Sequence, residues 1–225
     1  MNENKQKEAL KNADLINETT FAFSVAPLGQ ASAIDFGSYD PDRIKSGETM
    51  LYIDLNEDFF WSAQCQGFAL GTTENAWKWG SVKGAYQTVG NGMIYSIFDT
   101  GSSAIIIPEV FFGNFLDLIY AQMEGKEHEV EAGYVVTKCY PDFPTMFFLF
   151  DEKWIAVEPA EYVIDVSENK DRSLCVLLIS PGQEAFLVMG LPLYMNYYTV
   201  HEDIHNRIGF APHASSPKKS LTLGT

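Results

Sequence analysis

One aspartate, set in a tight turn between two apolar runs, places the strongest limit on how this chain can fold. The stretch Ile97–Ser103 reads IFDTGSS, and four apolar residues and a proline follow it. This pattern predicts a strand, a turn and a second strand. Because an unpaired carboxylate is expensive to bury, the turn must supply hydrogen-bond donors to Asp99.

The three residues after Asp99 have the chemistry to hold its carboxylate. Thr100 offers a hydroxyl to the neighbouring backbone, and Gly101 allows a conformation and a close approach that other residues resist. Ser102 can donate a hydrogen bond to the carboxylate, which would favour its ionised form and fix its orientation. Taken alone, the string also fits an ordinary turn, since Asp and Gly are common turn residues.

Short segments with period-two spacing, separated by Gly, Pro, Asn and Asp, predict a mainly β fold. In the second half we expect strands at Met146–Phe150, Trp154–Val157, Tyr162–Val166, Leu174–Ile179, Ala185–Met189, Tyr197–His201 and Arg207–Ala211. One amphipathic helix is predicted over about 109–123, because Pro108 and Glu109 favour a helix start and apolar residues follow at helical spacing. A shorter helix is predicted from Lys5 to Ile16.

Composition excludes several classes of partner. The chain has 225 residues and a formal net charge of −15, so nucleic acid and anionic membranes would be repelled. No apolar run reaches the length of a membrane span, and the polar residues 1–12 do not have the pattern of a signal peptide. Three cysteines leave at least one thiol free or paired with another chain. Asn17-Glu18-Thr19 fits a glycosylation acceptor.

The order of several elements resembles the C-terminal lobe of pepsin-like aspartic proteases (peptidase A1). Besides the Asp99 loop, the matching elements are Ala33–Asp40 (with Ser38 where the family has glycine), Phe60-Trp61, Val188-Met189-Gly190, Tyr197–Val200 and Arg207–Ala211. A long β region precedes Asp99 and no flap-like Tyr-Gly segment follows it, which favours the second lobe over the first.

The resemblance implies one lobe of the bilobal acid-protease fold, with antiparallel sheets, one amphipathic helix and an N-terminal connector helix. It divides the chain into a connector-like helix at 1–16, the lobe at 17–213 and a flexible tail at 214–225.

The resemblance also implies the roles of individual residues. Asp99 would be one member of a catalytic dyad whose partner aspartate is absent from the chain. Thr100, Gly101, Ser102 and Gly190 would support the catalytic loop, and Cys139 and Cys175 would form the lobe's disulfide. Cys65 has no family role and is expected to be a buried free thiol. The implied reaction is hydrolysis of a polypeptide substrate by an Asp-activated water, with no cofactor and no metal.

Function therefore depends on where a second aspartate comes from. Asp35-Phe36-Gly37 is the only other Asp-x-Gly, and Phe36 lacks the hydroxyl of the motif. The implied partner is an N-terminal protease lobe, as a missing half, a separate chain or a second copy. The alternative is a non-catalytic binding or structural lobe. Leu191 after the glycine and the altered Val200–Glu202 segment depart from the family pattern and are compatible with this alternative. By resemblance the compartment would be secreted or an acidic, lysosome-like vesicle.

One competing motif points to zinc. His201-Glu202-Asp203-Ile204-His205 satisfies H-E-x-x-H, which needs both histidines on one face of a helix. The residues before it are strand-like, Ile208 stands where the extended motif has glycine, and no Asp or Glu follows Asp203 as a third ligand. A strand end and hairpin turn is the expected structure here, and no metal site is predicted.

Overall fold

The computed structural model describes residues 9–16, 18–26, 31–56, 60–81, 92–123, 126–218 and 222–223. Contacts within the chain separate it into two compact units, each built from two stretches of sequence. Met1–Trp61 and Tyr194–Leu221 belong to the first unit, and Ser62–Leu193 and Thr222–Thr225 belong to the second. The predicted boundaries of connector, lobe and tail, at residues 16/17 and 213/214, stay predictions.

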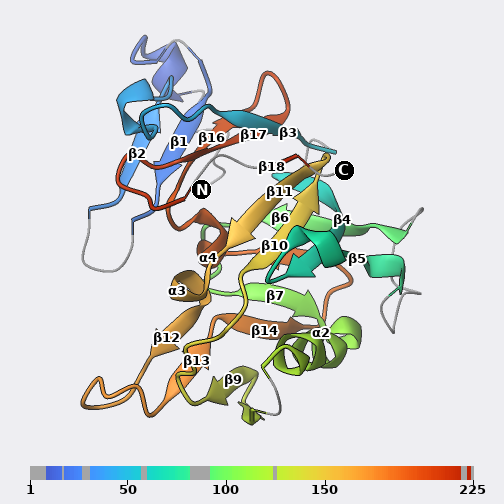
Figure 1. Cartoon of the computed structure of the whole chain (residues 1–225). Coiled ribbons are helices and arrows are strands. Elements are labelled where there is room, and N and C mark those ends of the chain that lie inside the picture. The colour runs from blue at the N-terminus through green and yellow to red at the C-terminus, as the bar shows by residue number, and fades with distance from the viewer. Residues whose placement is uncertain are drawn as a thin grey trace. The chain divides into compact units, whose positions relative to one another are not determined.

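The first unit is built on an antiparallel sheet of five strands in the order β2-β1-β16-β17-β3 (Figure 1). Its elements are β1 (Phe21–Ser24), β2 (Ala33–Phe36), the 3-10 helix η1 (Pro41–Arg43), β3 (Leu51–Asp54), β16 (Tyr197–Glu202) and β17 (Arg207–Pro212). All six residues of β16 are buried, because this strand lies in the middle of the sheet. The chain reverses after β2 at Gly37, whose φ of +85° suits glycine.

A polar network ties this sheet to the turn after β2. The Tyr198 hydroxyl donates to the Asp35 carboxylate at 2.6 Å and accepts from the Asp40 N–H at 2.9 Å. The Arg43 guanidinium forms an ion pair with Asp35 at 2.8 Å. Burial and the hydrogen bond to Asp35 raise the pKa of Tyr198 well above its usual range, so this hydroxyl remains a donor.

The helix predicted from Lys5 to Ile16 is shorter where the structure describes it. Residues 9–12 are helical, and residues 5–8 lie outside the described part. The helix ends because Asp14 takes a φ of 54°, and the Leu15 N–H turns back to the Leu10 carbonyl at 3.0 Å. A role as an interlobe connector stays a prediction.

The second unit contains a nine-stranded mixed sheet and a four-stranded antiparallel sheet. The larger sheet has the order β14-β7-β15-β6-β4-β10-β11-β18, with β5 paired to β4 (Figure 1). Its strands are β4 (Ser62–Leu70), β5 (Trp77–Lys78), β6 (Ile94–Phe98), β7 (Ile105–Pro108), β10 (Met146–Phe150), β11 (Lys153–Val157), β14 (Ile179–Gly182), β15 (Leu187–Met189) and β18 (Thr222–Leu223). The short helices are η2 (Thr73–Asn75), η3 (Trp79–Ser81), α3 (Pro159–Tyr162) and α4 (Leu191–Tyr194). The predicted mainly β fold is confirmed.

Helix α2 (Glu109–Ala121) is the amphipathic helix predicted over about 109–123, and it begins directly after Pro108. Its buried side chains are Phe111, Phe112, Phe115, Leu116, Ile119 and Tyr120. The Phe115 ring lies 5.0 Å from that of Phe68 on β4 and 6.2 Å from that of Trp79, measured between ring centroids. The aromatic face of this helix is therefore part of the core.

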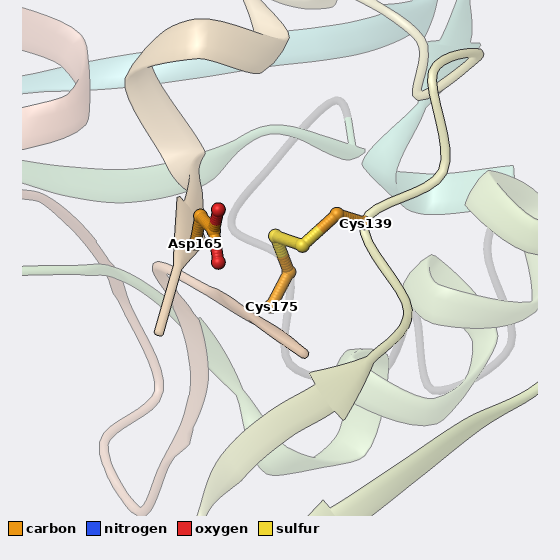
Figure 2. A group of neighbouring side chains, drawn as sticks. All are labelled: Cys139, Asp165 and Cys175. Carbon is orange, nitrogen blue, oxygen red and sulfur yellow. A yellow bond between two sulfur atoms is a disulfide. The ribbon is translucent and has the colours of Figure 1, made fainter. Parts of the chain in front are cut away.

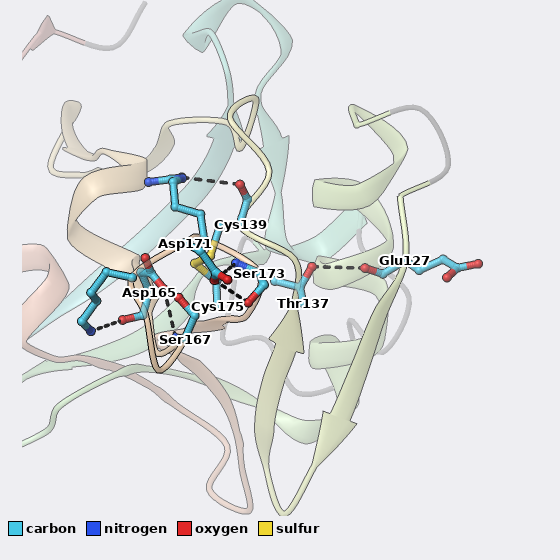
Figure 3. The surroundings of a disulfide bond; sticks show 10 residues. Glu127, Thr137, Cys139, Asp165, Ser167, Asp171, Ser173 and Cys175 are labelled. Carbon is cyan, nitrogen blue, oxygen red and sulfur yellow. Dashed lines mark hydrogen bonds between the residues drawn. A yellow bond between two sulfur atoms is a disulfide. The ribbon is translucent and has the colours of Figure 1, made fainter.

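A disulfide cross-links the smaller sheet. Its strands are β8 (His128–Glu131), β9 (Tyr134–Thr137), β12 (Val163–Asp165) and β13 (Cys175–Leu177), in the order β12-β13-β9-β8. Cys139 and Cys175 are bonded, with their Cα atoms 5.0 Å apart, which confirms the pairing that the resemblance implied. Figure 3 shows the bond's surroundings. The Arg172 guanidinium donates to the Cys139 carbonyl at 3.5 Å.

Cys65 on β4 is a buried free thiol, as expected. The Trp79 indole N–H donates to its sulfur at 3.2 Å, and burial raises the pKa of the Cys65 thiol to about 12. Because the thiolate is the reactive form, we expect no reaction of Cys65 with an aromatic disulfide reagent in the native protein at pH 8. One thiol per chain should react once denaturant is added. Fast labelling of the native protein would contradict this burial.

Candidate active site

Two parallel strands place Asp99 at the start of its turn. Strand β6 runs parallel to β15, with Phe98 opposite Met189. The chain then leaves the sheet, and the Asp99 N–H donates to the Met189 carbonyl at 3.0 Å. Asp99 is half-buried.

The turn supplies one donor to each carboxylate oxygen of Asp99. The Gly101 N–H donates to Oδ1 at 2.9 Å, and the Ser102 hydroxyl donates to Oδ2 at 2.6 Å. The Ser102 N–H closes the turn on the Asp99 carbonyl at 3.2 Å. Thr100 lies half-buried between these residues, and its supporting role stays a prediction. The carboxylate is thus held in one orientation by its own loop.

Gly190 packs against the back of the same turn. A Cβ atom at this position would lie 2.2 Å from the Ala104 carbonyl oxygen and 2.5 Å from that of Ser102. The next residue completes the contact, because the Leu191 N–H donates to the Ser102 carbonyl at 2.8 Å. Only glycine lets the end of β15 approach the loop this closely. The structure therefore brings Asp99, Gly101, Ser102 and Gly190 together.

We expect Gly190→Ala to cost about 1–3 kcal/mol of folding free energy, because the methyl group forces two backbone segments apart. Denaturant unfolding followed by fluorescence measures this loss. Gly113→Ala on α2 is the matched control, since its Cβ meets nothing within 4 Å. That change should stabilise the protein by about 0.5–1 kcal/mol, as alanine is the better helix former. Equal midpoints for the two variants would contradict the close packing at Gly190.

The sequence did not reveal what fixes the main chain at this site. The Met189 carbonyl that accepts from Asp99, and the Ala104 carbonyl that faces Gly190, belong to backbone and leave no side-chain signature. The sequence feature that indicated support for the Asp99 loop was Val188-Met189-Gly190, an apolar pair followed by glycine. Asp35, the other aspartate considered, lies on β2 and is bonded to Tyr198 and Arg43.

The H-E-x-x-H residues do not lie on a helix. His201 and Glu202 end strand β16, and His205 lies in the turn that leads to β17. The His201 ring is 2% exposed and stacks on Phe21, with 4.6 Å between ring centroids. Glu202 accepts from the Tyr52 hydroxyl at 2.9 Å and from Arg207 at 2.6 Å. The predicted strand end and turn are confirmed, with His201 packed in the core and Glu202 paired with Arg207.

A second group with metal-ligand chemistry lies at the disulfide. Within the residues that the structure describes, Cys139, Asp165 and Cys175 place potential ligand atoms within 4.8 Å of one another (Figure 2). Both sulfur atoms are bonded to each other, so neither is available as a thiolate ligand. The Asp165 carboxylate accepts hydrogen bonds from the Ser167 hydroxyl and N–H, which lower its pKa. We therefore interpret this group as a structural disulfide with a neighbouring carboxylate.

The family model for eukaryotic aspartyl proteases matches residues 2–213. The chain belongs to this family. It is 26% identical to aspartic protease 17 of Caenorhabditis elegans over 187 residues, and this matched stretch covers 81% of the chain and 42% of that protein. It is 23% identical over 158 residues to gastricsin of Cavia porcellus, covering 70% of the chain and 36% of that protein.

A third aspartyl protease relative is aspartic protease 3 of Toxoplasma gondii, 22% identical over 187 residues, which cover 82% of the chain and 26% of that protein. The chain thus spans about two fifths or less of the length of these curated relatives. Among the helices in the described part of this aspartyl protease homologue, none is long and apolar enough to cross a membrane.

Proposed function

We propose that this chain supplies one of the two catalytic aspartates of an aspartic endopeptidase. The observation that carries the proposal is the Asp99 carboxylate, half-buried and held by Gly101 and Ser102 at 2.9 and 2.6 Å. A carboxylate oriented by its own loop, on a residue that is not fully buried, suits acid–base work on a bound water. Within the described residues, the donors to this carboxylate are an amide and a hydroxyl, and none is a cationic side chain.

The chemistry requires a second carboxylate close to the first. When two aspartates share one proton, their titrations separate, as in the pepsin dyad that serves as a standard example. The ionised member then takes a proton from water as the water attacks the peptide carbonyl, and the protonated member donates to the carbonyl oxygen. The apparent pKa values belong to the pair. Asp99 on its own has no partner to create this split.

The second Asp-Thr-Gly loop would come from an N-terminal lobe. The partial coverage of the relatives is the support for this, since the chain spans 42% of aspartic protease 17 and 36% of gastricsin. That lobe could precede this chain in the same protein, be a separate chain or be a second copy. The substrate would be a polypeptide, and the disulfide suits a secreted or acidic-vesicle compartment, where such bonds persist.

A non-catalytic lobe is the second candidate, and Leu191 favours it. This leucine follows Gly190, where the family pattern has an acidic or amide residue, and its N–H holds the Ser102 carbonyl at 2.8 Å. The backbone support of the loop is thus kept while a polar side chain is lost. Such a lobe would bind peptides without hydrolysing them.

The test is cleavage of an unfolded protein at acidic pH by this chain produced together with the polypeptide encoded directly upstream of Met1. Cleavage that pepstatin blocks supports the protease. Peptide binding without cleavage, under conditions where both halves are folded, supports the non-catalytic lobe and overturns the proposal.

A further inference from the structure

One face of the four-stranded sheet carries apolar side chains on three adjacent strands. Alternation along each strand puts every second residue on this side, and cross-strand pairing aligns Ile164, Val176 and Val136 in one row. We call this the outer face. Its apolar members are Tyr134, Val136, Ile164, Val166, Leu174 and Val176. The three strands β9, β13 and β12 lie side by side in Figure 1.

The outer face is open to solvent. Tyr134 is 58% exposed, Leu174 44% and Val166 43%. An antiparallel sheet with one packed face normally shows polar residues on the other face. Here the second face carries exposed apolar side chains on three adjacent strands, and an exposed apolar patch is a feature of surfaces that bind another molecule.

The opposite face of the sheet is anchored in the core. Val135 and Leu177 point into the core and are at most 1% exposed. The Cys139–Cys175 bond ties β13 to the end of β9 from the same side. A partner would therefore meet a preformed surface, with little ordering cost on binding.

Glutamates border the outer face along the edge strand. Register places Glu131 opposite Tyr134 and Glu129 opposite Val136, so both carboxylates lie on the apolar side of the sheet. Glu127 continues the same alternation one step before β8, where the register sets it opposite Lys138, so Glu129 and Glu131 carry the net negative charge of this edge. All three glutamates are exposed. In Figure 3 the Glu127 side chain extends away from the disulfide. Successive glutamates on a strand are about 6.8 Å apart.

We propose that the outer face binds a basic amphipathic helix of a partner protein. Three strands about 4.8 Å apart offer an apolar strip about 10–15 Å wide, which matches the width of one helix. Residues four apart on a helix are separated by about 6 Å along its axis, close to the glutamate spacing. A helix with an apolar stripe and Lys or Arg at every fourth position beside it would satisfy both parts of the surface.

A second copy of this chain fits the surface poorly. The chain carries a net charge of −15, and packing two outer faces together would bring rows of glutamates of the same sign into one interface. Like charges opposed across an interface are costly. Charge complementarity therefore selects a cationic partner.

The probe is a synthetic helix of about 18 residues with a leucine stripe flanked by lysines, and a matched peptide carries glutamate in place of lysine. Fluorescence anisotropy measures binding to the full chain, and amide exchange locates it. We expect binding of the lysine peptide only, weakened by added salt, with protection on β9, β12 and β13. Equal binding of both peptides, or protection elsewhere, would overturn the proposal.

Two surface variants and a control sharpen this test. Tyr134→Ser with Leu174→Ser should weaken binding at least tenfold, while Glu129→Gln with Glu131→Gln should weaken it about fivefold and flatten the salt dependence. Asp203→Asn with Ile204→Ser changes the same chemistry on the β16–β17 turn and should have no effect. Full affinity of both outer-face variants would reject the surface. A concentration-dependent dimer that Tyr134→Ser with Leu174→Ser abolishes would show that a second copy is the occupant, and would also overturn the proposal.

Discussion

Asp99→Asn is expected to lower acid proteolysis by this chain, paired with its second lobe, by about 10³-fold, the range lost when an acid–base group is removed. Asparagine keeps the shape of the side chain and an oxygen to accept from the Gly101 N–H, now 2.9 Å from Oδ1. It cannot share a proton with another aspartate, so the dyad no longer holds an ionised and a protonated member. The measurement is the initial rate of cleavage of an unfolded protein at acidic pH.

The control for this prediction is a surface aspartate. Asp203→Asn removes one negative charge from the exposed turn before β17 and should leave the cleavage rate unchanged. Both variants should unfold at the wild-type denaturant concentration, so that a loss of rate reports chemistry. If Asp99→Asn keeps the wild-type rate, Asp99 is not the catalytic acid–base group.

Removing the disulfide is expected to destabilise the protein by about 3–4 kcal/mol, because the bond closes a loop in the unfolded chain. Cys139 and Cys175 are separated by 36 residues, and the bond holds β13 beside β9. The double substitution Cys139→Ser with Cys175→Ser should therefore lower the denaturant concentration at the midpoint of unfolding. The slope of the transition should rise as well, since the unfolded state becomes more expanded.

Reduction of the wild type is the matched control, because it breaks the same bond without changing a residue. The reduced wild type and the double variant should unfold at the same denaturant concentration. An unchanged midpoint in both would contradict a stabilising role for this bond.

Helix α2 and several strands were predictable because their signals are local. Pro108 and Glu109 start the helix, and the apolar spacing after them places its buried face. Strand β10 lies where the alternating residues predicted it, at Met146–Phe150, and β16 and β17 each extend one residue beyond the prediction. The strand and turn at H-E-x-x-H followed from the same local pattern.

Other features depend on tertiary contacts that leave no local signal. Leu174–Ile179 was predicted as one strand, but β13 belongs to the smaller sheet and β14 to the larger one. The chain changes sheets at Leu178, whose N–H donates to the Tyr162 carbonyl at 2.7 Å and whose carbonyl accepts from Ile105 at 2.9 Å. The apolar run of the sequence continues through Leu178, so no change in residue type marks the switch between the two sheets. The parallel pairing of β6 and β15, which fixes Asp99, is equally invisible in either segment alone.

The central claim is that Asp99 is half of a dyad, and the rate of pepstatin-sensitive cleavage by the purified 225-residue chain tests it most directly. The rate should be measured with the chain shown to be monomeric, before and after a lobe with a second Asp-Thr-Gly loop is supplied. We expect almost no cleavage by the monomer and a large increase on pairing. A monomer that cleaves at the full rate with no partner would contradict the need for a second aspartate.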